Sequence, residues 1–282
     1  MSDYPCMIEN LAFAEAPRWH DEELWFSDFF THQVIRVDHE GRAHVVVEVP
    51  GQPSGLGWLP DGRLLVVSML DRRLMRLDPT GLVEVADLSQ LADFHCNDMV
   101  VDAKGRAYIG NFGFDIFTQT VVPKPTVLVM VSTDGKASVA ATDMSFPNGT
   151  VITPDGHTMI IGETFAKRLT AFDIAEDGTL SNRRVWADLG KLAPDGICLD
   201  AEGAVWVASP RTNEFVRVLE GGAITRRIPV ANQGIACALG GKDGKRLFMV
   251  IGRVKAREEA MATRVGRIEY IDVDVPAAAA LR

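Results

Sequence analysis

The sequence predicts an all-β fold, a six-bladed β-propeller with four antiparallel strands in each blade. The first observation is a short pattern, a polar residue followed by a small residue and an apolar run, which occurs six times along the chain. The second is that β-rich runs with turn residues between them fill the rest of each repeat, with no room for a crossover helix. Strands alone, repeated with a period of roughly 40–50 residues, are typical of propellers.

The six copies of the pattern give the innermost strand of each blade. Their leading residues are Glu15, Ser54, Asn97, Asn148, Asp195 and Gln233. The steps between these positions are 39, 43, 51, 47 and 38 residues. Most copies close on a turn that contains glycine, as at Asp61-Gly62 and Asp155-Gly156, because glycine supplies the positive φ that tight turns need.

The remaining strands follow in order within each repeat. The second strands are predicted at residues 64–67, 107–109, 158–161, 204–207 and 246–250, and the third strands at 33–37, 74–77, 127–131, 169–172 and 215–218. Residues 7–13 precede the first copy, and the last copy ends near residues 267–273. We therefore expect the N-terminal strand to complete the last blade as its outer strand, which makes residues 1–282 one closed domain.

Composition limits the classes of partner. The net charge of -9 and the scattered Lys and Arg residues argue against a nucleic-acid partner. No apolar run reaches the roughly 18–20 residues that span a bilayer, and no signal peptide is recognised at the N-terminus. The four cysteines form no C-x-x-C pair. We expect a soluble cytoplasmic protein with a small-molecule partner and no membrane partner; the oligomeric state is not predicted.

The leading positions of the six copies predict a site. Equivalent positions on the inner strands of a propeller converge at one face of the channel, which brings Glu15, Asn97, Asn148 and Asp195 together. One such residue is more often a turn residue that satisfies backbone groups. Five of the six leading residues, however, have an amide or carboxylate side chain. Such a set favours a bound cation, since neighbouring carboxylates repel each other without one. Oxygen ligands suit Ca²⁺, Mg²⁺ or Mn²⁺, and the lack of His or Cys weakens but does not exclude Zn²⁺.

Two insertions interrupt the repeats. Residues 111–125 carry Phe112, Phe114 and Phe117, which either face a ligand or pack on a neighbouring blade. Residues 254–264 are rich in Ala, Glu, Arg and Met and predict a short helix, interpreted as a surface decoration. The ends of the second strands carry a further set of polar residues, which we interpret mainly as surface or turn residues: Ser68, Asn111, Glu163 and Ser209, with Arg253 near the same register.

The chain resembles the senescence-marker-protein, gluconolactonase and luciferin-regenerating family, which includes regucalcin. Four motifs in order carry the resemblance: Glu15-Ala16-Pro17-Arg18-Trp19, Asn97-Asp98, Pro147-Asn148-Gly149 and Pro194-Asp195-Gly196. It covers essentially the whole chain. It implies a six-bladed propeller with one divalent cation on its axis, bound by Glu15, Asn148 and Asp195. It also implies a substrate-facing Asn97 and metal-dependent hydrolysis of a lactone.

Two departures from the family pattern bear on the substrate. Ala16 stands where glycine is common, and His95 precedes Asn97 where members that act on sugar lactones often carry Arg. With Phe112 and Phe114 as candidate substrate contacts, we expect a less polar, aliphatic or aromatic lactone. Asp195 is our candidate general base. His95 would donate to the leaving oxygen or shape the pocket. Ca²⁺ is the favoured cation, with Zn²⁺, Mg²⁺ and Mn²⁺ as alternatives.

Three other functions fit the same sequence. The first is a calcium-binding regulatory protein without catalysis. The second is a related propeller hydrolase that acts on phosphotriesters or other esters with the same cation. The third is a protein-binding scaffold, which would have no reason to gather Glu15, Asn148 and Asp195 on the axis.

Overall fold

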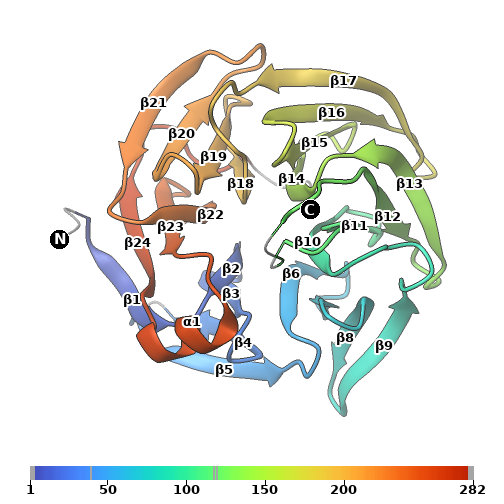
Figure 1. The fold of residues 1–282 in the computed structure, drawn as a ribbon, viewed down its shortest axis with the longest axis horizontal. Helices are drawn as coiled ribbons and strands as arrows, with labels where there is room; N and C mark the ends of the chain where they lie inside the picture. Colours follow the sequence, from blue (N-terminus) through green and yellow to red (C-terminus); the bar gives the residue numbers. More distant parts are fainter. Residues whose placement is uncertain (1–3, 39, 117, 119, 279–282) are drawn as a thin grey trace.

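The protein folds into a six-bladed β-propeller. The structure is a computed structural model, which describes residues 4–38, 40–116, 118 and 120–278. Within these residues, six antiparallel sheets of four strands each surround a central channel (Figure 1). No helix in the described part of the chain has the length and apolar character needed to cross a bilayer. The predicted fold class is therefore confirmed.

The first three blades follow one another directly in the sequence, each from its inner strand outwards. Blade 1 contains β2 (Ala14–His20), β3 (Glu23–Asp28), β4 (Gln33–Val37) and β5 (Ala43–Glu48). Blade 2 contains β6 (Pro53–Trp58), β7 (Leu64–Ser68), β8 (Arg73–Asp78) and β9 (Gly81–Asp87). Blade 3 contains β10 (Cys96–Val101), β11 (Ala107–Asn111), β12 (Thr126–Val131) and β13 (Ala137–Met144).

The last three blades repeat this order, with one helix added. Blade 4 contains β14 (Pro147–Ile152), β15 (Thr158–Glu163), β16 (Arg168–Ile174) and β17 (Leu180–Asp188). Blade 5 contains β18 (Ile197–Leu199), β19 (Val205–Ser209), β20 (Glu214–Val218) and β21 (Ile224–Pro229). Blade 6 contains β22 (Gln233–Gly240), β23 (Arg246–Gly252) and β24 (Gly266–Asp272), with α1 (Arg257–Thr263) between the last two.

The N-terminal strand closes the ring, as predicted. β1 (Cys6–Leu11) is the outer strand of blade 6, which has the order β1-β24-β23-β22 (Figure 1). It pairs antiparallel with β24, where Ile8 lies opposite Ile268, and an ion pair of 3.0 Å joins Arg267 to Glu9. Both ends of the propeller chain are thereby held in one sheet, and blade 6 has no open outer edge on β24.

Apolar side chains fill the spaces between neighbouring blades. Between blades 1 and 2, for example, Val34 packs in one cluster with Leu56 and Val66, all of them fully buried. Alternate residues of each strand point to opposite faces of the blade, so both faces of a blade contribute to such a cluster. Full burial of one such side chain is worth about 1.5–3 kcal/mol. These contacts hold the inner strands, and hence the residues that start them, in fixed positions.

The inner strands approach one another so closely that the residue after most leading positions is small, with Asp98 after Asn97 as the exception. The N–H of Gly149 donates to the carbonyl of Asp195 at 3.1 Å, and the N–H of Gly196 donates to that of Ile235 at 2.9 Å. A Cβ on Gly149 or Gly196 would lie 2.4 Å or 2.3 Å from the next blade, inside contact distance. Ala16 holds the same place in blade 1 with a φ of 48°, a left-handed conformation that glycine adopts more easily.

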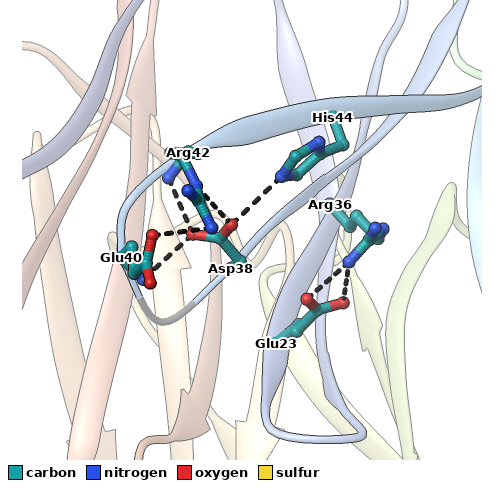
Figure 2. A network of polar contacts seen from close by, with 6 residues as sticks. All are labelled: Glu23, Arg36, Asp38, Glu40, Arg42 and His44. Atoms are coloured by element: carbon teal, nitrogen blue, oxygen red, sulfur yellow. Dashed lines mark hydrogen bonds and ion pairs between the residues drawn. The ribbon is translucent and has the colours of Figure 1, made fainter.

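At the β4–β5 turn, far from the channel mouth, charged side chains pair with one another. Figure 2 shows the β4–β5 turn, where Asp38 accepts hydrogen bonds from the Arg42 and His44 side chains at 3.0 Å and 3.1 Å. On the strands beside it, Arg36 forms an ion pair with Glu23. This turn lies at the end of blade 1 opposite to Glu15, because residues 37 and 24 are paired neighbours. The scattered basic residues thus have local acidic partners here.

Candidate functional site

A cavity of about 320 Å³ lies where the inner strands begin. Four of the leading residues line it, namely Glu15 on β2, Asn97 on β10, Asn148 on β14 and Asp195 just before β18. All four are at least nine-tenths buried. The structure therefore brings together, from four different blades, the residues that the sequence assigned to cation and substrate.

Hydrogen bonds hold all four side chains, including one from Asn97 Nδ2 to Pro147 O at 3.4 Å, and leave several oxygen atoms free. The Asn148 amide donates to Asp195 Oδ1 at 2.6 Å and to Thr164 Oγ1 at 3.3 Å. The backbone N–H of Ala16 donates to Glu15 Oε2 at 2.8 Å. Asp195 Oδ2, Glu15 Oε1 and Asn148 Oδ1 have no hydrogen bond to a described residue and are available to a ligand.

The charges in this part of the channel are unbalanced. A third buried carboxylate, Asp98, accepts from Arg18 at 2.6 Å. Burial, followed by repulsion from Asp195 and Asp98, raises the pKa of Glu15 well above its usual value. Burial, opposed by the Asn148 hydrogen bond, raises the pKa of Asp195 to about 8. Three carboxyl groups thus share one guanidinium, and full ionisation would leave a net charge of -2.

This donor set fits one divalent cation bound by oxygen ligands. Two carboxylates and the Asn148 amide oxygen are the ligand types that hard cations prefer, and one divalent ion would cancel the surplus charge. In the described part of the chain, no three His, Cys, Asp or Glu side chains gather closely enough to hold a metal by themselves. The fit therefore depends on the amide of Asn148, with the amide of Asn97 beside it.

The other two leading residues do not line the cavity. Ser54 is buried, and its carbonyl accepts from the Ser27 hydroxyl at 2.6 Å. Gln233 Oε1 accepts from the backbone N–H of Val254 at 2.7 Å and so holds the start of the 254–264 insertion. Of the six leading residues, four therefore line the cavity and two hold neighbouring segments of the chain in place.

A second ring of residues, of which the sequence interpretation named only His95, lines the cavity above the first. We call it the collar, and its members stand two positions before a leading residue: Phe13, Gln52, His95 and Phe146. Their carbonyls occupy equivalent places, because each accepts a backbone N–H from the end of the next strand in its blade: Phe29, Met69, Phe112 and Thr164, at 3.0, 2.8, 2.9 and 3.2 Å. The same repeat spacing that gave the first ring could have identified the collar.

The aromatic residues of the first insertion take different places. Phe112 lines the cavity and stacks on Phe146, with ring centroids 4.6 Å apart. Phe114 is buried behind it, against Phe146 and Phe165, and is not among the residues that line the cavity. Phe117 lies outside the described residues. Both alternatives for this insertion thus occur, one for each described ring.

His95 lies at the cavity wall between two aromatic rings. It stacks on Phe94, with centroids 4.0 Å apart, and its edge contacts Phe112. Burial, reinforced by Arg72 and opposed by Asp115, lowers the pKa of His95. Its Nδ1 is buried and has no hydrogen-bond partner among the described residues. This nitrogen is closed off from the cavity, so the ring contributes to the wall mainly by packing.

The second insertion contains the predicted helix but is more than a surface decoration. Ala260 of α1 is buried in the same cluster as Phe13, Phe29 and Phe30. The residues before the helix, from Val254 to Arg257, line the mouth of the cavity. The expectation that this segment lies apart from any site was therefore wrong, because packing of Ala260 holds it over the channel.

The polar residues at the ends of the second strands are structural and buried, which corrects the surface interpretation. Ser68, Asn111, Glu163 and Ser209 are each 2% exposed or less. Asn111 accepts from Thr126, and Glu163 pairs with Arg168 at 2.9 Å. None of these four lines the cavity. The side chains of Asn111 and Glu163 tie adjacent strands of one blade, a role that the sequence pattern alone does not distinguish from a turn.

Comparison with known proteins identifies the family. A sequence model described as the SMP-30/Gluconolactonase/LRE-like region matches residues 13–253. Pentonolactonase from Haloferax volcanii is 24% identical over 278 residues, 92% of this chain and 90% of that protein. Regucalcin from Danio rerio is 26% identical over 275 residues, covering 91% and 89%. The crystal structure of a calcium-binding regucalcin from Agrobacterium tumefaciens, 22% identical, has the same fold, with a TM-score of 0.78 over 99% of this chain and 98% of that one. The chain belongs to the SMP-30/gluconolactonase/LRE-like family.

Proposed function

We propose that this protein is a lactonase that depends on one divalent cation and acts on an apolar lactone. The observation that carries the proposal is the buried group of Glu15, Asn148 and Asp195, whose surplus negative charge lies at the base of a mainly apolar cavity. The lactonase named among the relatives supports the reaction type. The calcium-binding regucalcin of the same fold supports a divalent cation, with Ca²⁺ favoured.

The cavity wall supports the choice of an apolar substrate. Five phenylalanine rings and a methionine line it, whereas the carboxylates and the two asparagine amides lie at its base and the charged side chains of Lys255 and Arg257 lie at its mouth. A sugar lactone carries several hydroxyl groups, and each would lose water on entering such a wall without a partner to replace it. An aliphatic or aromatic lactone buries its body against the rings and places only its ester group at the polar base.

Each polar residue has a defined task in this proposal. When bound, a divalent cation supplies a Lewis acid at the lactone carbonyl. Asp195 Oδ2 accepts the proton of the attacking water, while Asn148 holds Oδ1 and so orients the carboxylate. Asn97 orients the substrate. His95 donates a hydrogen bond to the ring oxygen. The proton that Asp195 took from water passes to this oxygen when its bond to the carbonyl carbon breaks, which yields the hydroxy acid and restores the carboxylate.

The direct test is an assay of lactone hydrolysis with a pH indicator, on protein stripped by a chelator and then reloaded. We expect the stripped protein to lose activity and to regain it with Ca²⁺, Mg²⁺, Mn²⁺ or Zn²⁺, with γ-phenyl-γ-butyrolactone preferred over a sugar lactone. Asp195→Asn should lower kcat/KM by roughly a hundredfold or more, since it removes both a ligand charge and the proton acceptor. Asp93→Asn, at an exposed position outside the cavity, serves as the control.

Two outcomes would contradict this function. Full activity of the stripped protein would show that hydrolysis does not require a cation. Tight cation binding without hydrolysis of any lactone would favour the alternative, a calcium-binding regulatory protein, which the same oxygen ligands also fit.

A further inference from the structure

Gln52 is a buried polar residue for which the fold provides no partner. It is 6% exposed and lines the cavity. Its side-chain amide makes no hydrogen bond to any described residue. The amide atoms nevertheless remain accessible to a ligand. The amide therefore faces the cavity. Burial of an unpaired amide costs free energy, which a ligand with a hydrogen-bonding group would recover.

The backbone at Gln52 is held in a strained conformation. Its φ is 67°, in the left-handed region that glycine adopts more easily than other residues. Two hydrogen bonds keep it there: Gln52 N–H donates to Val49 O at 3.0 Å, and Met69 N–H donates to Gln52 O at 2.8 Å. Strained residues of this kind gather at binding sites. The strain fixes the direction of the side chain without any contact from the amide itself.

The collar around the cavity is polar on one side only. Gln52 belongs to blade 2 and His95 to blade 3, which are neighbours. The other collar residues, Phe13 and Phe146, belong to blades 1 and 4 and are apolar. The Nδ1 of His95 is buried out of reach of the cavity, so the amide of Gln52 is the group that can meet a ligand on this side. One side of the collar can therefore form hydrogen bonds, and the other can only pack.

We propose that Gln52 determines specificity by hydrogen-bonding a hydroxyl or carbonyl substituent on an otherwise apolar lactone. This inference rests on the proposed lactonase function and narrows its substrate class. The substrate has an ester group at the base of the cavity and an apolar body against Phe13 and Phe146. A single polar substituent on that body points to the side of blades 2 and 3.

The test compares matched lactones that differ in one hydroxyl group. The parent protein, Gln52→Met and Gln52→Gly are assayed on γ-phenyl-γ-butyrolactone and on its α-hydroxy and β-hydroxy derivatives. Methionine keeps the length of the side chain without its amide, and glycine relieves the positive φ, so at least one variant should fold. Gln90→Met makes the same chemical change at an exposed position away from the cavity.

The parent should hydrolyse at least one hydroxylated lactone with a higher kcat/KM than the unsubstituted one. Both Gln52 variants should lower kcat/KM for that hydroxylated lactone by roughly tenfold, the usual effect of one neutral hydrogen bond, and leave the unsubstituted lactone within twofold. Equal loss on both substrates, or no loss on either, would overturn the proposal.

Binding separates this inference from the proposed reaction. If the parent hydrolyses none of these lactones, the lactonase function fails, and the role of Gln52 is then decided by calorimetry with the matching lactams, which resist hydrolysis. A hydroxylated lactam that binds the parent more tightly than the plain one, with the difference lost in Gln52→Met, supports the proposal. A difference of the same size in both proteins, or in neither, refutes it.

Discussion

At the scale of single residues, the site is defined by charge that the protein does not neutralise itself. Glu15, Asp98 and Asp195 are buried near one another, and Arg18 pairs with Asp98 alone. A bound divalent cation would therefore add stability as well as chemistry, because without it the two cavity carboxylates repel each other when ionised.

The pH dependence of stability follows from the raised pKa of Asp195. In the unfolded chain this carboxyl titrates near its ordinary value, and in the folded protein at about 8. The folded state thus binds more protons than the unfolded state between these values. The contribution of Asp195 to the free energy of unfolding is therefore most favourable at low pH and falls as the pH rises from about 4 to about 8. In the ion-free protein, Asp195→Asn should raise the melting temperature most at pH 8, less at pH 5, and leave it nearly unchanged below about pH 4.

Melting curves in the presence of a chelator check this prediction, with Asp93→Asn as the control for loss of one negative charge. Added Ca²⁺ should reverse the order at pH 8, because the parent gains from binding and the variant gains less. If the ion-free parent and Asp195→Asn have the same melting temperature at pH 8, ionisation of Asp195 does not destabilise the folded protein and the prediction is wrong.

At the scale of elements, short inner strands and their close contacts place the site residues. β18 has only three residues, yet Asp195 before it is fixed, since its N–H donates to Ala208 O at 3.0 Å. The hydrogen bond from Gly196 to Ile235 then links blade 5 to blade 6. The pattern of a polar residue followed by a small one thus has a physical reason, because only a small residue fits where two blades touch.

The closing strand β1 offers a test at this scale. Leu11 is 5% exposed and packs in the cluster that joins blades 6 and 1. Leu11→Ala should lower the free energy of unfolding by about 2–4 kcal/mol, as a cavity in a well-packed core does. Chemical denaturation measures the effect. Val45→Ala, at an exposed position on β5, should change it by no more than about 0.5 kcal/mol. Equal effects would mean that the junction is not a packed core.

At the scale of the whole molecule, repetition made most of the fold predictable from the sequence. Six copies of one strand pattern predicted the blades, and the position before Gly149 or Gly196 predicted which polar side chains meet at one cavity. Repetition is informative because equivalent residues must occupy equivalent places around one axis. The closing strand was predicted for the same reason, since the last blade otherwise lacked a fourth strand.

The parts that do not repeat were the parts that sequence could not place. The path of an insertion depends on packing against its neighbours, so the roles of Phe114 and of the residues from Val254 to Arg257 emerged only from the structure. Gln52 does follow the repeat, but the ring that it shares with His95, which the sequence had indicated, mixes polar and aromatic residues and so shows no chemical pattern along the sequence.

The most direct test of the account is a calorimetric titration of Ca²⁺ into the stripped protein. The parent should bind one ion per chain at the cavity, since one divalent cation cancels the charge left by three carboxylates and Arg18. The double variant Glu15→Gln/Asp195→Asn, which keeps the shape of both side chains, should lose this binding. Failure of Ca²⁺, Mg²⁺, Mn²⁺ and Zn²⁺ alike to bind the parent, or equal binding to parent and variant, would contradict the central claim.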